Sequence, residues 1–371
     1  MGPVTANTQH WPRLASAEVA DGRPLRVAHL LPNLAVGGRE RLTNMLCETG
    51  TAHGLAPMLI GYDPLPEAAA SFAPTVAYRQ LDRTVPDFLV QLRHVLQEEQ
   101  IDVVHAQGHI PACYLAQVLE TMPNAPASIA TMHVGLQGTW RWVWPIRQGL
   151  RAMDHLIAVS EDMARTYARL AGRPVAYRPN GLDCRHFAQA APTAPSSGPF
   201  CFAMVSRLDR VKRHVAAVTA CDRLIAAGQS IELHIAGEGP VGPRLTAMAQ
   251  SRPWLVLAGA IDDPAHFLRG KHAFLMPSQA EGMPLALAEA MASGMPSVVS
   301  DLPSLRRMAR EGALYARPGS SCELARQMLH LISDHSVWAD MGARAQHLAQ
   351  AFDIHDVARD YAAIYRQLCA L

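Results

Sequence analysis

Residues 273–301 read AFLMPSQAEGMPLALAEAMASGMPSVVSD, in which two short apolar runs flank a loop and an apolar, alanine-rich stretch. Within it, Pro284 suits the first position of a helix, and Gly294 suits the position just after a helix ends. A strand, a helix and a second strand in this order are typical of a parallel sheet whose strands are joined by helices. The segment therefore predicts an α/β fold.

The same alternation continues along most of the 371 residues and falls into two series. A stretch at 188–200 that is rich in Ala, Pro, Ser and Gly separates the two series and has the composition of a linker. We therefore predict two Rossmann-like, doubly wound domains, at 25–190 and 198–352, which face each other across a cleft at the C-terminal ends of their strands. The predicted strands are 25–31, 56–62, 102–107, 127–133 and 155–160, then 200–206, 231–237, 254–259, 273–278 and 296–301.

The amino-acid composition excludes several classes of function for this chain. Lys and Arg total 33 against 32 Asp and Glu, so the net charge of +1 argues against an extended nucleic-acid partner. The seven cysteines are scattered without C-x-x-C pairs, which argues against a disulfide framework or a zinc knuckle and favours a reducing, cytoplasmic compartment. The sequence has no run of about 18 apolar residues that could span a membrane. Residues 1–24 lack the apolar core of a secretion signal, and we interpret them as a flexible extension.

Two glutamates stand eight positions apart in the opening segment. Glu281 falls in the predicted loop, and Glu289 falls in an almost wholly apolar helix. Helical side chains tilt toward the N-terminus, so Glu289 is expected to point back toward the mouth at which Glu281 lies. A carboxylate in such a helix needs hydrogen-bonding partners, for which sugar hydroxyls are suitable. The alternative is a solvated helix face with a capping glutamate.

This E-x7-E pattern resembles the retaining glycosyltransferases of the two-Rossmann (GT-B) type, group 1 and family 4-like, which include sucrose synthase and many bacterial mannosyl- and glucosyltransferases. The resemblance covers residues 25–370. It implies that Glu289 binds the ribose hydroxyls of a nucleotide sugar and that Glu281 lies beside the donor sugar. It places Met283 and Leu285 in the same nucleotide-binding segment. It also implies that a C-terminal helix at 353–371 packs back on the first domain.

Basic residues follow the first strand of the second series. In MVSRLDRVKRH, Arg207 and Lys212 have the R-x4-K spacing that straddles the donor diphosphate in the family that this chain resembles. Two cations there would stabilise the diphosphate as it leaves. The resemblance also implies that no metal ion or other cofactor is required. The alternative is a solvated basic turn.

Further candidates follow strands of the first series. Gly37 and Gly38, in LPNLAVGGRERL, lie in a strand-to-helix turn where the missing Cβ atoms allow a phosphate to approach the backbone. His133 ends the strand at 127–133, and a histidine at this place in the family touches the donor sugar. A structural role remains open for these three residues. His105 and His109 have no carboxylate or cysteine to complete a metal site, and we interpret them as cleft residues on a loop.

A second glycine turn suggests a different activity. Gly237, Gly239 and Gly242 have the G-x-G-x-x-G spacing of a dinucleotide-binding loop, so a nicotinamide-dependent oxidoreductase must be considered. The turn lies in the middle of the second series, however, whereas such a loop normally opens a domain. Glycosyltransferases of this type commonly have GxGP here, which Gly237, Gly239 and Pro240 match. These glycines are therefore assigned to a turn near the nucleotide.

The stretch TWRWVWPIRQGLR at 139–151 interleaves three tryptophans with arginines: Trp140, Trp142 and Trp144 with Arg141, Arg147 and Arg151. This mixture suits a membrane interface, and an amphipathic helix with its tryptophans turned inward is the alternative. The first interpretation predicts peripheral contact with the inner face of the plasma membrane and a lipid-linked saccharide as hydroxyl acceptor. A soluble acceptor, or a nucleotide-sugar-binding subunit without activity, remains open.

Overall fold

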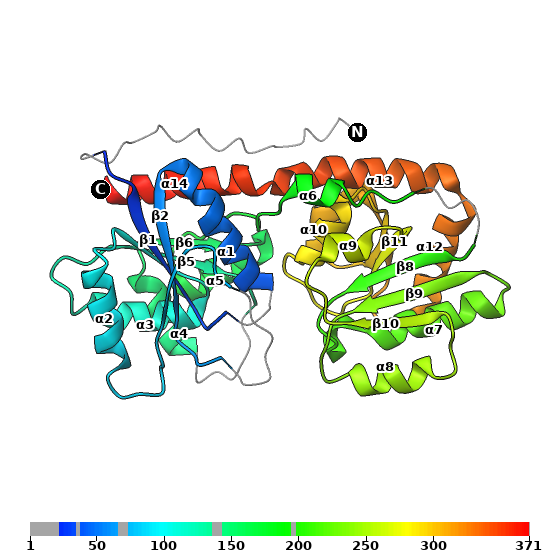
Figure 1. The fold of residues 1–371 in the computed structure, drawn as a ribbon, viewed down its shortest axis with the longest axis horizontal. Helices are drawn as coiled ribbons and strands as arrows, with labels where there is room; N and C mark the ends of the chain where they lie inside the picture. Colours follow the sequence, from blue (N-terminus) through cyan, green and yellow to red (C-terminus); the bar gives the residue numbers. More distant parts are fainter. Residues whose placement is uncertain (1–21, 35–37, 66–72, 136–142, 194–197, 371) are drawn as a thin grey trace.

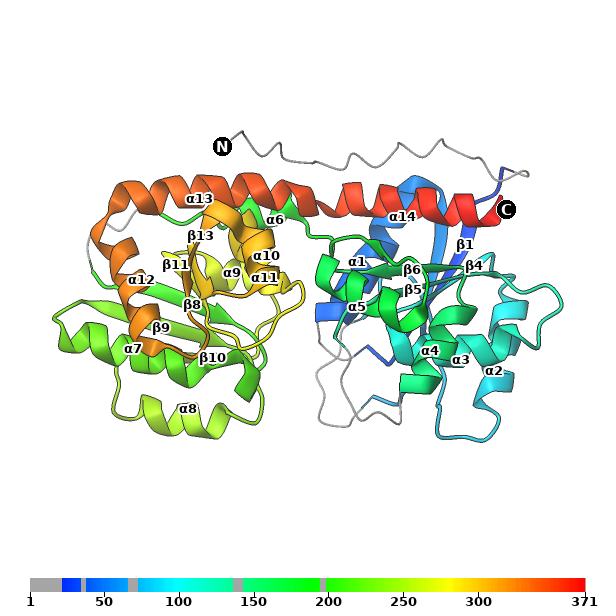
Figure 2. The ribbon, with the colours of Figure 1, turned by 180° about the vertical axis from the view of Figure 1, so that it is seen from behind.

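The computed structural model describes residues 22–34, 38–65, 73–135, 143–193 and 198–370. Gly37, most of the predicted extension at 1–24, and Trp140, Arg141 and Trp142 lie outside these residues. The described chain forms two parallel sheets, each covered by helices on both faces (Figure 1; Figure 2 shows the view from behind).

The first sheet has seven parallel strands in the order β3-β2-β1-β4-β5-β6-β7. Helices α1 and α14 cover one face of this sheet, and α2 to α5 pack on the other. The strands are β1 Leu25–Leu31, β2 Leu55–Gly61, β3 Ala77–Gln80, β4 Val103–Ala106, β5 Ala127–Met132, β6 His155–Ala158 and β7 Ala176–Tyr177. The helices are α1 Gly38–Gly50, α2 Phe88–Glu98, α3 His109–Leu119, α4 Val143–Ala152, α5 Glu161–Ala171 and α6 Cys184–Ala188, with a short 3-10 helix, η1, at Thr51–His53.

The second sheet has six parallel strands in the order β10-β9-β8-β11-β12-β13. The strands are β8 Phe200–Val205, β9 Ile231–Ala236, β10 Leu255–Gly259, β11 Ala273–Met276, β12 Ser297–Ser300 and β13 Ala313–Ala316. The helices of this domain are α7 His214–Ala226, α8 Gly242–Ala249, α9 Pro264–Leu268, α10 Leu285–Ala292, α11 Pro303–Ala309, α12 Ser321–Ser333 and α13 His335–Ala349, with 3-10 helices η3 Arg210–Lys212, η4 Arg310–Gly312 and η5 Gln350–Phe352. The last helix, α14 Ile354–Cys369, packs on the first sheet.

All ten predicted strands are present, and their ends lie within two residues of the predictions. Three further strands were not predicted: β3, β7 and β13, each of which lies at the edge of its sheet. An edge strand pairs on one side only and carries a weak apolar pattern, as β3 shows with its sequence AYRQ and its mostly exposed side chains. In both sheets the strand order reverses beside the first strand of the domain, which creates the position where such sheets bind ligands.

Helix α14 returns the chain to the first domain. Helices α13 and α14 run end to end along one side of both sheets (Figures 1 and 2). The chain passes between them beside Leu182, whose backbone N–H donates to Phe352 and whose carbonyl accepts from Ile354. The buried face of α14 packs against β1, β4, β5 and β6 through Val357, Tyr361, Ile364 and Tyr365.

Truncation after Phe352 is expected to prevent stable folding of the first domain. It would remove five large buried side chains, those of Ile354, Val357, Tyr361, Ile364 and Tyr365. Each is worth about 1.5–3 kcal/mol, and their sum approaches the whole stability of a typical domain, about 5–15 kcal/mol. Yield of soluble protein and thermal melting by circular dichroism measure the effect. Truncation after Cys369, which keeps α14 whole, is the control, and a soluble and cooperatively folded Phe352 truncate would contradict the expectation.

Candidate active site

The site lies where the C-terminal ends of the two sheets face each other. The loop between β11 and α10 reaches the first domain, since the Sδ of Met283 accepts a hydrogen bond from the backbone N–H of Asn180 at 3.0 Å. The Asn180 side chain also donates to the Met283 carbonyl at 3.3 Å. An ion pair between Arg307 and Asp162 joins the domains nearby. The segment with the two glutamates therefore forms part of the domain contact.

Lys212 and Glu281 form an ion pair in this cleft. The Nζ of Lys212 lies 2.7 Å from Oε1 of Glu281, and the Glu281 side chain is only 7% exposed. Lys212 ends the 3-10 helix η3, whose N-terminus is capped by Asp209 through hydrogen bonds from the N–H groups of Val211 and Lys212. The Oγ of Ser304 donates to the Glu281 carbonyl at 2.9 Å. The backbone of both residues is thus held by local structure in the segments that follow β8 and β11.

Arg207 follows β8 as predicted, but its side chain is 81% exposed and lies 3.3 Å from Asp209. The glycine turn after β9 packs against the loop that carries Arg207. A Cβ atom on Gly237 would lie 1.9 Å from the Ser206 carbonyl oxygen, and one on Gly239 would lie 2.7 Å from the carbonyl oxygen of Leu208. Both glycines also have positive φ, 131° and 151°. These two glycines therefore permit a close approach between two loops of the second domain.

Glu289 lies in α10 among buried residues, with Ala288 and Ala290 on either side. Burial raises the pKa of its carboxyl to about 7; Arg41 in α1 opposes this shift and Asp263 adds to it. Among the described residues its carboxylate has no hydrogen bond and no ion pair. A half-buried acceptor without a donor is suited to bind hydroxyl groups.

Arg41 is a cation at this site that was not predicted from the sequence. It lies in the first turns of α1, directly after the glycine turn, and acts on Glu289 across the cleft. Its guanidinium is 4.0 Å from the exposed carboxylate of Asp262. The only signal in the sequence was its place in GGRERL beside Glu40, which itself accepts a hydrogen bond from Arg39 at 2.9 Å.

His133 lies directly after β5 and is held by a chain of hydrogen bonds. Its Nε2 lies 2.7 Å from Oε1 of Gln107, which can only accept. The Gln107 amide nitrogen in turn donates to Nδ1 of His29 at 2.9 Å. Burial, and then Arg39, lower the pKa of His133 to about 3, while a hydrogen bond with Asn180 opposes the shift. His133 is therefore a neutral polar group at physiological pH and not a cation.

The structure also places His105 and Gly38. His105 lies in β4 and not on a loop, and its ring is buried between Tyr365 and Thr131, each at 2.7 Å. The prediction of a cleft residue was wrong, because a histidine that is satisfied by two core hydroxyls cannot be recognised from its neighbours in sequence. Gly38 begins α1, where an added Cβ would lie 3.2 Å from Leu285. It allows α1 to approach α10 closely.

Comparison with known proteins adds to this geometry. Residues 36–186 match the protein family described as Glycosyltransferase Family 4, and residues 199–334 match the family described as Glycosyl transferases group 1. EpsF of Bacillus subtilis, a protein named as a glycosyltransferase, is 26% identical over 284 residues, which are 70% of each chain. The GDP-mannose:cellobiosyl-diphosphopolyprenol alpha-mannosyltransferase of Komagataeibacter xylinus is 27% identical over 239 residues, 62% of this chain and 60% of the relative.

Among solved structures, HepE from Anabaena in complex with UDP-glucose resembles this chain with a TM-score of 0.77. The likeness covers 94% of this chain and 100% of HepE, at 17% sequence identity. At this level of sequence identity, the similarity supports a shared fold only. It confirms the prediction of two Rossmann-like domains.

Proposed function

The chain belongs to the GT-B glycosyltransferases of the family 4 type, and from this premise we propose that it transfers a hexose from a nucleoside diphosphate sugar to a hydroxyl acceptor with retention of configuration. The observation that carries the proposal is the Glu289 carboxylate, which lies in an apolar helix without a donor and with a raised pKa. Ribose hydroxyls would supply that donor. The Lys212 ammonium at the end of β8 is suited to the diphosphate.

The proposed chemistry is a displacement on one face of the sugar. The acceptor oxygen forms a bond to the anomeric carbon on the face from which the phosphate oxygen departs, and the acceptor proton passes to that phosphate oxygen. Lys212 and Arg207 stabilise the negative charge that grows on the leaving diphosphate. Neutral His133 already donates from Nε2 to Gln107, so at the sugar it can only accept a hydrogen bond, through Nδ1, and it does not act as an acid. No carboxylate needs to form a covalent intermediate in this scheme.

A thermal-shift screen of the purified chain against UDP- and GDP-sugars tests the donor class. The K. xylinus relative is named for GDP-mannose, and HepE was solved with UDP-glucose, so both bases belong in the screen. A donor at 100 times its dissociation constant stabilises the folded state by about 2.7 kcal/mol. Stabilisation by one class, followed by release of its nucleoside diphosphate, supports the proposal. Binding without turnover would indicate a nucleotide-sugar-binding subunit instead.

Chelation by EDTA is expected to leave turnover largely intact. Lys212, Arg207 and Arg41 supply positive charge around the proposed diphosphate, so the reaction as proposed needs no metal ion to neutralise it. The measurement is product formation with and without EDTA at saturating donor. Loss of most activity that magnesium or manganese restores would contradict this part of the proposal.

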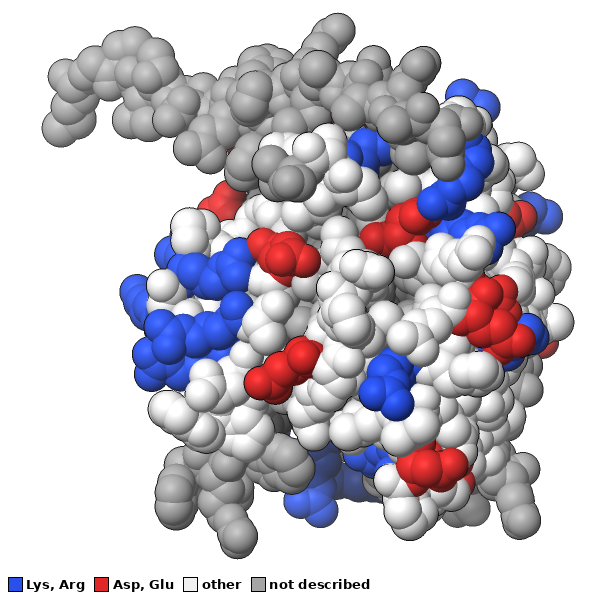
Figure 3. All heavy atoms as spheres, turned by 90° about the vertical axis from the view of Figure 1, so that its left-hand side faces the viewer, with Lys and Arg blue, Asp and Glu red and all other residues white. Residues whose placement is uncertain are grey.

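The proposed acceptor is a lipid-linked saccharide at the inner face of the cytoplasmic membrane. Apolar side chains are exposed beside the cleft end of the first sheet: Val134 is 46% exposed, Val143 43% and Trp144 64%. Trp144 thus faces outward, as the membrane interpretation requires. On the outer face of the first domain, basic and acidic side chains are interspersed (Figure 3). No helix of the described residues is both long and apolar enough to cross a bilayer.

Binding to anionic liposomes should be peripheral and should depend on Trp144. Burial of the apolar side chains of Trp144 and Val143 drives their transfer to the membrane interface. Arg147, in the same helix, can add about 1 kcal/mol near an anionic surface. Co-sedimentation compares wild type with Trp144→Ala. Val90→Ser, which changes an exposed apolar residue (54% exposed) in α2, is the matched control. Equal binding of Trp144→Ala, or no binding of wild type at low salt, would favour a soluble acceptor.

A further inference from the structure

Three side chains of metal-ligand type meet on the second sheet, away from the cleft. Cys201 in β8 pairs in register with Glu232 in β9, and Ala203 pairs with His234. Alternate residues of a strand share one face, so Cys201, Glu232 and His234 point to the same side of the sheet. Cys201 and Glu232 are each the second residue of their strand. The group therefore lies near the strand ends opposite to the proposed donor site.

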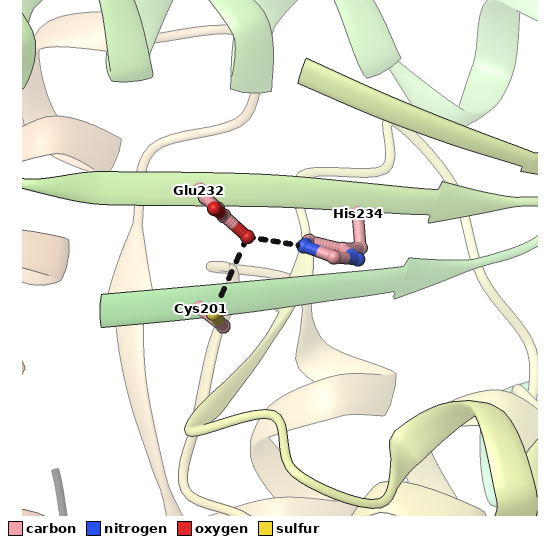
Figure 4. Close-up of side chains that lie close together, drawn as sticks. All are labelled: Cys201, Glu232 and His234. Carbon is pink, nitrogen blue, oxygen red and sulfur yellow. Dashed lines mark hydrogen bonds and ion pairs between the residues drawn. The ribbon is translucent and has the colours of Figure 1, made fainter. Parts of the chain in front are cut away.

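The distances within the group are close to those of a coordination sphere. The Oε2 atom of Glu232 lies 2.7 Å from Nε2 of His234 and 3.7 Å from Sγ of Cys201 (Figure 4). The three ligand atoms all lie within 4.8 Å of one another. A tetrahedral zinc ion with ordinary bond lengths holds its ligand atoms roughly 3.3–3.8 Å apart. Small side-chain rotations are sufficient to reach that geometry.

We propose that Cys201, Glu232 and His234 bind one Zn²⁺ ion, with water in the fourth position. A thiolate, a carboxylate and a neutral imidazole form a borderline-soft donor set that suits zinc, and the two negative charges balance the ion. Cys201 loses its proton to solvent on binding. Its backbone N–H donates to Nδ1 of His272 at 2.8 Å, which fixes the strand at this ligand.

Nearby groups shift the pKa of the Cys201 thiol, some upward and one downward. Burial and then Glu232 raise the pKa of the Cys201 thiol, whereas Lys271 lowers it. Without a cation the thiol therefore stays protonated at neutral pH. The Glu232 side chain is 36% exposed and that of His234 is 18% exposed, so an ion can reach them from solvent. Because the ion would join β8 to β9 and lies away from the cleft, its expected role is to stabilise the second domain.

The test is titration of the full chain with Co²⁺, which replaces Zn²⁺ and reports thiolate ligation by absorption. The exposed thiols are first removed in a Cys322→Ser/Cys369→Ser background. We expect one equivalent to give a thiolate charge-transfer band and intense visible bands, both abolished by excess Zn²⁺. Cys201→Ser and His234→Ala should each weaken binding at least tenfold. His330→Ala, an exposed histidine in α12, is the matched control and should bind as wild type does.

A second measurement does not depend on the folding of a variant. Zn²⁺ should slow alkylation of Cys201 in the native chain, as followed by mass spectrometry of that residue, and should raise the melting temperature without changing turnover. The proposal is overturned if the native chain shows no thiolate band, if Cys201→Ser binds Co²⁺ as tightly as its parent, or if Zn²⁺ leaves alkylation of Cys201 unchanged.

Discussion

Glu289→Gln is expected to weaken donor binding roughly 100-fold at pH 8. Hydrogen bonds to a charged group contribute about 1.5–3 kcal/mol each, and loss of about 3 kcal/mol corresponds to roughly 100-fold in the dissociation constant. The amide keeps the shape of the side chain but accepts less strongly from two hydroxyls. Isothermal titration with the nucleotide sugar measures the effect.

Glu289→Gln should also remove the pH dependence of donor affinity. The pKa of Glu289 is raised to about 7 in the free protein, and ribose hydroxyls are best accepted by the ionised form. Donor affinity of the wild type should therefore fall as the pH drops below 7, by up to about tenfold per unit. The glutamine variant should bind weakly and equally across that range. Glu311→Gln, which changes an exposed carboxylate, is the control and should keep the wild-type profile.

Glu289→Gln should weaken donor binding but stabilise the folded state of the free protein. The folded-state pKa of Glu289 lies above its ordinary value of 4.5, so ionisation of this group disfavours the folded state. The cost appears as the pH rises from 4.5 to 7 and is constant above 7. Glu289→Gln should therefore make the free protein about 2–3 kcal/mol more stable at pH 8. Unchanged donor affinity alone would contradict the proposed binding role of Glu289, and unchanged stability would contradict the cost of its buried charge.

Lys212→Ala is expected to lower kcat by about 100- to 1000-fold with little change in donor affinity, since charge on the leaving diphosphate grows only as the bond breaks. Steady-state rates and donor titration separate the two quantities. Arg207→Ala should act in the same direction. Because Arg207 is 81% exposed and its one ion pair within the described residues is with Asp209, its removal should leave stability unchanged.

Removal of Lys212 also leaves the Glu281 carboxylate, only 7% exposed, without its ion pair. This should cost about 1–3 kcal/mol of stability. The double variant Lys212→Met/Glu281→Gln removes both charges and should recover stability but not turnover. A double variant that regains activity would show that the loss in Lys212→Ala came from misfolding and not from the missing ammonium group.

The fold was largely predictable because apolar runs and glycines mark buried parallel strands and helix ends. The strand β11 and the helix α10 follow from AFLMPS, Pro284 and Gly294 alone, although α10 begins one residue later, at Leu285, with Pro284 as its N-cap. Edge strands such as β3 were missed because one-sided pairing places fewer apolar residues in the sequence. Local pattern therefore predicts the centre of each sheet better than its rim.

The site was predictable only where spacing along the chain carries the signal. Glu281 and Glu289 share one loop and helix, and Arg207 and Lys212 share one turn. Arg41 reaches Glu289 from the other domain, and no periodicity joins these two positions. Gln107 and His29, which hold His133, likewise come together only through neighbouring strands. The proximity of Cys201 and His234 could not be predicted either, because the register between β8 and β9 brings them together.

The return of α14 to the first sheet has a consequence for synthesis on the ribosome. The face formed by Val27, Val103 and Ile129 is covered by α14, which is synthesised only after the whole second domain. The N-terminal domain therefore cannot complete its folding first, although domains made early usually do so. The nascent chain should present this apolar face until α14 has emerged from the ribosome, and the second domain should finish before the first. Chaperones that bind emerging apolar strands are expected to be retained on residues 25–132 until α14 covers this face.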